Sequence, residues 1–271
     1  MPDGKAAFRL RVLSALALVP VALAIVVAGG WIYGAFVGLL AVLMALEWSR
    51  LSGARFGRDY GRLAGGVALG VGLAATILAA LGRPREAVAC VALGMVLAGV
   101  LARTHAAASL WASIGVALVG LPAVALVWLR SIPDIGLDLL LWLLIVVWTT
   151  DTAAYVVGRR VGGPRLAPVV SPGKTWSGLG GGVIGASLAS VITGWALGSE
   201  RLLQLAGLGA VFALLAQLGD LAESMLKRRA GVKDSGSLIP GHGGVLDRVD
   251  GLLLTAPALA VLVAAKAWPW P

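Results

Sequence analysis

Long apolar runs, separated by short polar connections, dominate the chain. A bilayer core calls for roughly 20 apolar residues per helix, and backbone groups in lipid have to be satisfied within their own segment. The ten-residue alternation of a transmembrane β-barrel is missing. The pattern therefore predicts an all-α, polytopic integral membrane protein with about nine transmembrane helices. The runs cover residues 12–28, 31–48, 63–81, 87–102, 108–129, 137–158, 176–198, 202–222 and 251–268.

Lysine and arginine are unevenly shared between the connections. If the N-terminus is cytoplasmic, the inner connections contain 17 of the 22 basic residues. Basic residues favour the cytoplasmic side, so this split predicts a cytoplasmic N-terminus and polar loops 159–175 and 223–250 on the cytoplasmic side. We expect an integral protein of the cytoplasmic (inner) membrane. We attribute the net charge of +9 to this topology signal and to contacts with anionic lipid headgroups. Nucleic-acid binding is not expected, because the sequence offers no soluble basic domain for it.

The chain shows no internal repeat, linker or low-complexity region. We therefore expect one integral membrane domain over residues 1–271. Within it, residues 1–136 supply five N-terminal helices, and residues 137–271 supply four helices and both polar loops. The seventh helix begins with glycines at four-residue spacing, which predicts close helix packing in lipid: Gly178 with Gly182, and Gly181 with Gly185.

Residues 219–251 hold five of the thirteen acids in the chain. Asp220, Glu223 and Lys227 fall on one face of a helix, and Asp247 and Asp250 are three residues apart at the start of the last helix. Two carboxylate pairs on adjacent helix ends can converge on one cation, and Mg²⁺ prefers such oxygen ligands together with waters and substrate phosphates. The alternative is that these acids are solvated helix ends paired with nearby bases. We favour metal binding for Asp220 and Asp247, because an acid at membrane depth is costly without a partner and acids inside membranes generally mark functional sites.

The segment between these acids is rich in glycine, which lets its backbone fold tightly around an anion. Arginine forks and lysine ammonium groups can clamp phosphates there. His242 is a phosphate donor, a general base or a loop organiser, and we rank it as a binder or organiser above a catalyst. Asp234 suits a solvated role but is kept with the substrate-binding candidates. The basic candidates are Lys227, Arg228, Lys233 and Arg248.

The other polar loop offers a second set of candidates. Asp151 lies inside an apolar helix and needs a partner, so it is a substrate-site candidate or an interhelical tie. Ser171, Lys174 and Thr175 precede the seventh helix, where free N–H groups can meet a phosphate. The nucleotide-loop motif is absent, because Pro168 stands where that motif requires glycine.

These motifs resemble those of a known family. Residues 224–250, SMLKRRAGVKDSGSLIPGHGGVLDRVD, are similar to the signature of the phosphatidate cytidylyltransferases, also called CDP-diglyceride synthases. A looser resemblance covers DTAAYVVGRRVG at 151–162 and SPGKTWSG at 171–178, where Gly173 replaces a usual lysine and Ser177 a usual glutamate. The resemblance covers roughly the C-terminal half of the chain.

The resemblance implies that CTP and phosphatidic acid react to CDP-diacylglycerol and pyrophosphate at the cytoplasmic membrane face. It also implies Mg²⁺ with a second, monovalent cation (K⁺), and a homodimer. By position, Asp220 and Asp247 become metal ligands, with Glu223 and Asp250 in support. The implied phosphate contacts are Ser171, Lys174, Lys227, Arg228, Lys233 and Arg248.

The expected mechanism is an in-line attack of the lipid phosphate on the α-phosphorus of CTP. An ionised phosphate needs no general base, so the site has mainly to neutralise charge and fix geometry. Asp220, Asp247 and Lys227 are the predicted catalytic residues. Two alternatives remain open: a CTP-dependent polyprenol or phytol kinase, and a cation-coupled transporter, in which acids inside helices mark ion pathways.

Overall fold

The computed structural model describes residues 19–103, 106–236 and 243–269. Within these ranges, seven helices are long and apolar enough to cross a membrane, which confirms the expected all-α class of a polytopic membrane protein. Two shorter apolar helices are Val19–Ala28 and α10 (Leu252–Ala264), and α9 (Leu246–Val249) is a single turn. The long helices are α2 (Gly30–Phe56), α3 (Arg58–Ala80), α4 (Pro84–Leu101), α5 (Ala106–Ser131), α6 (Gly136–Val161), α7 (Trp176–Ala196) and α8 (Leu202–Arg229).

Two of these helices extend well beyond the apolar runs that predicted them. Helix α2 continues past residue 48 to Phe56, and α8 continues past residue 222 to Arg229. Hydropathy marks only the apolar part of a helix, whereas the helix itself ends where the backbone turns. Those turns use glycine in the left-handed region, with φ of 99° at Gly57 and 75° at Gly231.

The connection between α6 and α7 is a small hairpin. Strands β1 (Arg165–Ala167) and β2 (Ser171–Thr175) pair antiparallel, with Arg165 opposite Thr175 and Ala167 opposite Ser171. The sequence predicted only a polar loop here. The hairpin gives Lys174 and its neighbours an extended backbone directly before the first turn of α7.

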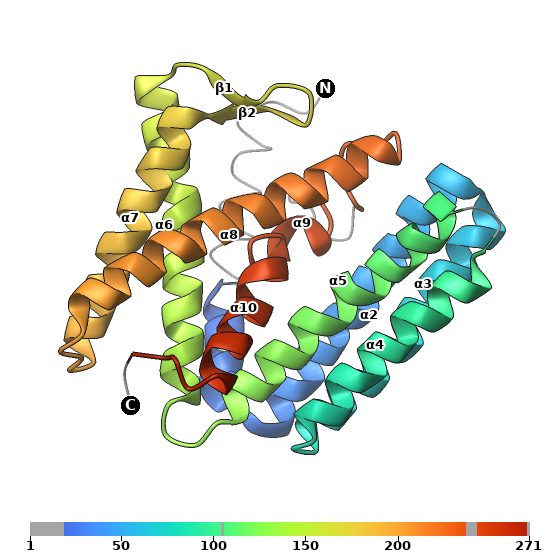
Figure 1. The fold of residues 1–271 in the computed structure, drawn as a ribbon, viewed down its shortest axis with the longest axis horizontal. Helices are drawn as coiled ribbons and strands as arrows, with labels where there is room; N and C mark the ends of the chain where they lie inside the picture. The colour runs from blue at the N-terminus through green and yellow to red at the C-terminus, as the bar shows by residue number, and fades with distance from the viewer. Residues whose placement is uncertain (1–18, 104–105, 237–242, 270–271) are drawn as a thin grey trace. The chain divides into compact units, whose positions relative to one another are not determined.

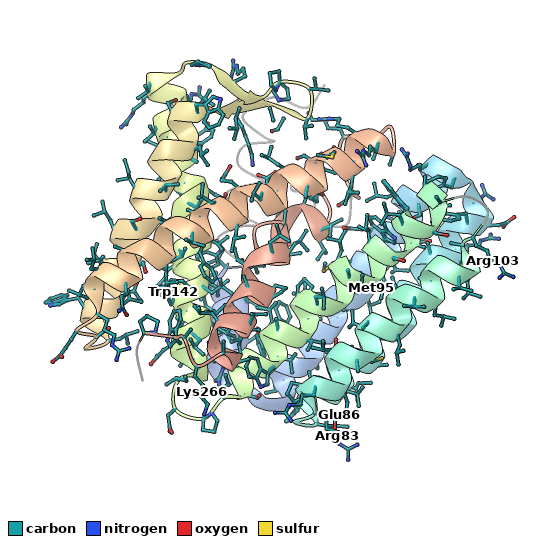
Figure 2. The ribbon with its side chains drawn as sticks, in the orientation of Figure 1. Arg83, Glu86, Met95, Arg103, Trp142 and Lys266 are labelled. Atoms are coloured by element: carbon teal, nitrogen blue, oxygen red, sulfur yellow. The ribbon has the colours of Figure 1, made fainter. Side chains whose placement is uncertain are left out.

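The chain forms two compact units, which are described separately. The first comprises residues 1–133 and 227–249, and the second comprises residues 134–226 and 250–271. In the first unit, helices α2 to α5 lie side by side (Figure 1). Arg83 and Glu86 lie at one end of α4 and Arg103 at the other (Figure 2). Small residues allow close helix approach, since a Cβ added to Gly72 would lie 2.7 Å from Val119.

In the second unit, α6 packs along α7. A Cβ added to Gly178 would lie 2.8 Å from the Ala154 carbonyl oxygen, and one added to Gly185 would lie 2.7 Å from Ala153. The glycine spacing therefore marks a packing face, as the sequence predicted. Trp142 of α6 is fully buried (Figure 2), and its indole N–H donates to the Ser190 hydroxyl of α7 at 2.8 Å. That hydroxyl in turn donates to the Leu205 carbonyl of α8 at 2.6 Å, so a short polar chain links three helices.

Candidate functional site

A cavity of about 710 Å³ lies in the second unit, between α6, the hairpin, the start of α7 and the middle of α8. It brings together several residues that the sequence had singled out from separate loops. Its polar lining includes Asp151, Ser171, Lys174, Thr175, Gln217 and Asp220. Charged groups of both signs therefore face one hollow in a largely apolar unit.

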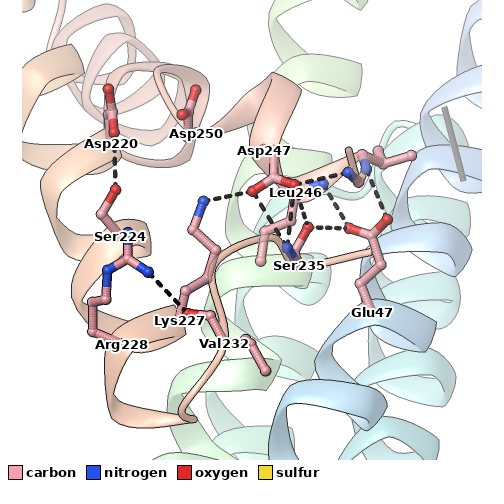
Figure 3. A network of polar contacts seen from close by, with 12 residues as sticks. Glu47, Asp220, Ser224, Lys227, Arg228, Val232, Ser235, Leu246, Asp247 and Asp250 are labelled. Atoms are coloured by element: carbon pink, nitrogen blue, oxygen red, sulfur yellow. Dashed lines mark hydrogen bonds and ion pairs between the residues drawn. The ribbon is translucent and has the colours of Figure 1, made fainter. Parts of the chain in front are cut away.

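Lys174 and Asp220 form an ion pair at the cavity. The Lys174 ammonium lies 2.7 Å from Asp220 Oδ2, and the two side chains are 18% and 27% exposed. Ser224, one turn further along α8, donates to Asp220 Oδ1 at 3.3 Å (Figure 3). Strand β2 supplies the lysine and α8 supplies the carboxylate. A lysine held in place by a carboxylate beside a cavity is ready to contact an anionic ligand.

Asp151 lies on α6 and lines the same cavity. The side-chain amide of Gln217, on α8, donates to Asp151 Oδ1 at 3.4 Å. This contact fits the interhelical tie that the sequence left open, while the place of Asp151 in the cavity lining fits a substrate contact. Sequence reasoning missed Gln217, although an amide inside an apolar run was a usable signal. In the structure its exposure is 6%.

Thr175 caps the N-terminus of α7. Its hydroxyl accepts from the Gly178 N–H at 3.0 Å and lies 3.0 Å from the Ser177 hydroxyl. Ser177 also donates to the Gly162 carbonyl. The Thr175 side chain thus shapes the helix start next to the cavity. Ser177, which departs from the resembling motif, takes part in the same local network.

The first unit contains a second ion pair, between Lys227 at the end of α8 and Asp247 of α9. The ammonium lies 2.5 Å from Asp247 Oδ1, and the side chains are 12% and 6% exposed. Asp247 Oδ2 also accepts from the Gly244 N–H at 2.7 Å and lies 3.0 Å from the Ser235 hydroxyl (Figure 3). The Ser235 N–H is 3.2 Å from the same oxygen. This carboxylate is therefore held by several donors at once.

Glu47 of α2 belongs to this network and was missed by the sequence reasoning. It is fully buried, and it accepts from the Val245 and Leu246 N–H groups and from the Ser235 hydroxyl (Figure 3). An acid within the apolar run 31–48 was the signal that could have identified it. Its partners are almost 200 positions away in the sequence, so periodicity could not name them.

The end of α8 is closed by a Schellman motif. The Gly231 N–H donates to the Arg228 carbonyl at 3.0 Å, and the Val232 N–H donates to the Lys227 carbonyl at 3.0 Å. The Arg228 side chain contacts the Val232 carbonyl at 3.4 Å and is exposed. Lys233, Asp234 and Arg248 are exposed as well, so their side chains are accessible to a ligand. His242 lies outside the described residues.

The four predicted metal ligands divide between the units. Asp220, Glu223 and Asp250 belong to the second unit, and Asp247 belongs to the first. Glu223 is buried on α8, and Asp250 Oδ1 accepts from the Gly251 N–H at 2.7 Å. No group of three or more His, Cys, Asp or Glu side chains is placed to hold a metal within the described parts of the chain. Within each unit the carboxylates suit Mg²⁺, which commonly takes one or two carboxylates and completes its shell with waters and substrate phosphates.

Comparisons with known proteins extend over nearly the whole chain. A family model described as the cytidylyltransferase family matches residues 9–265. A Brucella suis biovar 1 protein named phosphatidate cytidylyltransferase is 37% identical over 270 residues, which are 96% of this chain and 94% of the relative. A Pseudomonas aeruginosa protein of the same name is 38% identical over 274 residues, covering 96% of this chain and 98% of the relative. A Haemophilus influenzae protein, also so named, is 46% identical over 130 residues, covering 46% of this chain and 45% of the relative.

Proposed function

Because the chain belongs to the cytidylyltransferase family, we propose that it is a nucleotidyltransferase that converts CTP and phosphatidic acid into CDP-diacylglycerol and pyrophosphate. The observation that carries this proposal is similarity over almost the whole length to relatives named phosphatidate cytidylyltransferase. The seven apolar helices fit a lipid substrate that stays in the bilayer.

In the proposed reaction, a phosphate oxygen of the lipid forms a bond to the α-phosphorus of CTP. The bond from that phosphorus to the bridging oxygen breaks, and pyrophosphate leaves with the electron pair. The nucleophile is already ionised near neutral pH, so no proton has to be removed. The obstacle is repulsion between two anions, and preorganised positive charge lowers it.

The two ion pairs supply positive charge at fixed positions. Lys174 in the second unit and Lys227 in the first are each held by a carboxylate within hydrogen-bond distance. Because the carboxylate already fixes the side-chain conformation of each lysine, little further conformational entropy is lost when the ammonium group binds phosphate oxygens. Both lysines are proposed to bind phosphates, in company with the Ser171 hydroxyl and the exposed Arg228, Lys233 and Arg248.

Mg²⁺ is proposed as a cofactor, with a monovalent cation such as K⁺ as a second. Asp220 and Asp247 are each proposed as metal ligands, with Glu223 and Asp250 in support. When bound, Mg²⁺ would neutralise phosphate charge and act as a Lewis acid. The carboxylate chemistry of these residues suits that hard cation.

A nine-span topology with a cytoplasmic N-terminus is also proposed, with CTP binding on the cytoplasmic side of the inner membrane. Basic residues gather in the last turns of α2, α6 and α8, where the structure has Arg55, Arg159, Arg160 and Lys227 to Arg229. If consecutive spans cross the membrane in opposite directions, the even-numbered helices α2, α6 and α8 all run the same way. Their basic C-terminal ends would then lie at the same membrane face. Assembly as a homodimer is proposed from the family resemblance alone.

Purified protein given phosphatidic acid vesicles and CTP labelled on the α-phosphorus tests the activity. We expect label in the lipid, with loss of incorporation when EDTA removes divalent cations. Asp220→Asn and Asp247→Asn should lower incorporation at least about 10–100-fold. Asp59→Asn should leave it unchanged, because the Asp59 side chain is 97% exposed and pairs with Arg62. Label in lipid from γ-labelled CTP would identify a lipid kinase instead. Ion uptake into liposomes without CTP turnover would identify a transporter.

A further inference from the structure

Glu47 is an acid in a membrane-spanning helix, yet its polar contacts lie in a distant part of the sequence. Its exposed fraction is 0%, and burying a carboxylate is costly unless donors surround it. Oε1 accepts from the Val245 N–H at 2.8 Å, and Oε2 accepts from the Leu246 N–H at 2.8 Å. Oε2 also lies 2.9 Å from the Ser235 hydroxyl. Hydrogen bonds to an ionised acceptor are roughly twice as strong as neutral ones.

The same donors bring Glu47 next to Asp247. The Ser235 hydroxyl lies between the two acids, 2.9 Å from Glu47 Oε2 and 3.0 Å from Asp247 Oδ2. It has one hydrogen, so it donates to one carboxylate at a time or shares the hydrogen between them. The Val245 and Leu246 amides that Glu47 binds lie immediately before Asp247 in the chain. Glu47 therefore holds the backbone of the two residues that immediately precede Asp247.

The glycines around Glu47 show how closely the backbone approaches it. A Cβ added to Gly236 would lie 2.8 Å from Glu47 Oε1, and one added to Gly244 would lie 2.5 Å from the same oxygen. A side chain at either position would displace the carboxylate or the backbone. These glycines leave room for the contacts with Glu47.

A second contact from the same helix supports the arrangement. Arg55, two turns after Glu47 on α2, donates to the Arg229 carbonyl at the end of α8. Its guanidinium also lies 4.9 Å from the Trp111 ring centroid and 5.0 Å from that of Phe56. Helix α2 thus contacts the chain both shortly after Lys227 and shortly before Asp247, the two members of the buried ion pair.

We propose that Glu47 is a positioning residue, which holds Ser235 and the Gly244–Leu246 backbone so that Asp247 and Lys227 keep their arrangement. This role rests on the proposed function, in which Asp247 and Lys227 act on the phosphates. It makes an N-terminal helix part of the catalytic apparatus, although the family signature lies in the C-terminal half. Outer contacts that orient a metal-binding carboxylate typically cost 10–100-fold when removed.

Glu47→Gln is the test substitution, because it keeps the size of the side chain but replaces one acceptor with an N–H₂ group. That group would face N–H or O–H donors instead of accepting from them. We expect kcat and kcat/KM for CTP to fall together by about 10–100-fold. Hydrogen–deuterium exchange of the Val245 and Leu246 amides, measured on the intact protein in detergent, should quicken by about 10-fold.

Ser52→Ala is the matched control. Ser52 lies on the same helix, is fully buried, and accepts from the Trp111 indole N–H at 3.0 Å, so its loss removes one buried hydrogen bond without touching the Asp247 region. We expect it to lower thermal stability while kcat and the exchange at residues 245 and 246 stay at wild-type values. Ser235→Ala, a second test variant, should lower kcat to a smaller extent than Glu47→Gln and should also quicken the exchange.

Wild-type kcat in folded Glu47→Gln protein would overturn the proposal, and so would a fall in kcat without faster exchange. Equal losses of kcat in Glu47→Gln and Ser52→Ala at equal thermal shifts would also overturn it, because they would indicate general destabilisation. If Glu47→Gln does not fold, the Ser235→Ala variant decides. Wild-type kcat and wild-type exchange rates in that variant would overturn the proposal. Failure of the proposed function is distinct, since the wild-type protein itself would then transfer no α-label.

Discussion

Replacing Asp220 by Asn removes a charge while keeping the shape of the side chain, and it should destabilise the second unit through Lys174. At 2.7 Å and an effective dielectric constant of about 20, the attraction between the two charges is about 6 kcal/mol before desolvation is subtracted. Exposed pairs contribute a net of about 0–1 kcal/mol, and breaking a buried pair costs about 3–5 kcal/mol. With side chains 18% and 27% exposed, this pair lies between these limits. We expect a coupling of about 1–3 kcal/mol.

A double-mutant cycle measures this coupling. Thermal unfolding midpoints are compared for the wild type, Asp220→Asn, Lys174→Met and the double variant, in detergent without CTP. Each kcal/mol corresponds to a shift of about 2–4 °C for a domain of 150–250 residues. The double variant should lose less than the sum of the single variants, because each single change leaves one charge without its partner.

The exposed pair of Asp59 and Arg62 provides the control cycle. Its atoms are 3.4 Å apart, and its side chains are 97% and 71% exposed. The variants Asp59→Asn and Arg62→Met should therefore be additive. Additivity of the Asp220 and Lys174 variants within about 0.5 kcal/mol would refute the reasoning, since interacting sites are expected to couple more strongly than that.

Two further predictions follow from the site. Asp247→Asn leaves the Lys227 ammonium, only 12% exposed, without its charged partner, so α-label transfer to lipid should fall at least about 10–100-fold; unchanged turnover per folded molecule would contradict this role. Thr175→Ala removes the cap of α7 and should cost about 0.5–2 kcal/mol in thermal stability, and Thr175→Ser should recover most of it. A serine variant as unstable as the alanine variant would show that the cap is not the cause.

Hydropathy predicted the helices well because each span has to satisfy its own backbone in lipid. Helical spacing also placed Asp220, Glu223 and Lys227 on one face, and α8 continues as a helix through all three. Local pattern could not show where the helix stops. The helix ends before Gly231, whose backbone has a left-handed φ. The sequence alone does not show which of the glycines in this segment adopts that conformation.

Among the site residues, the sequence identified Lys174 and Asp220 but not their pairing. The two come from segments 46 positions apart, and the β-hairpin that brings the lysine to the cavity is too short to be read from alternation. Glu47 and Gln217 were missed for a related reason. Each is a polar residue within an apolar run, and its importance comes from partners contributed by distant segments. The expectation that the carboxylates share a metal remains a prediction.

The separation between Glu47 and its donors has a consequence for biosynthesis. Glu47 is made early, while Ser235, Val245 and Leu246 follow 188 to 199 residues later. At about 5–20 residues per second, the ribosome adds these donors about 10–40 seconds after the acid. During that interval the Glu47 carboxylate lacks its native donors. The contacts that hold the backbone before Asp247 can therefore form only after residue 246 has been made.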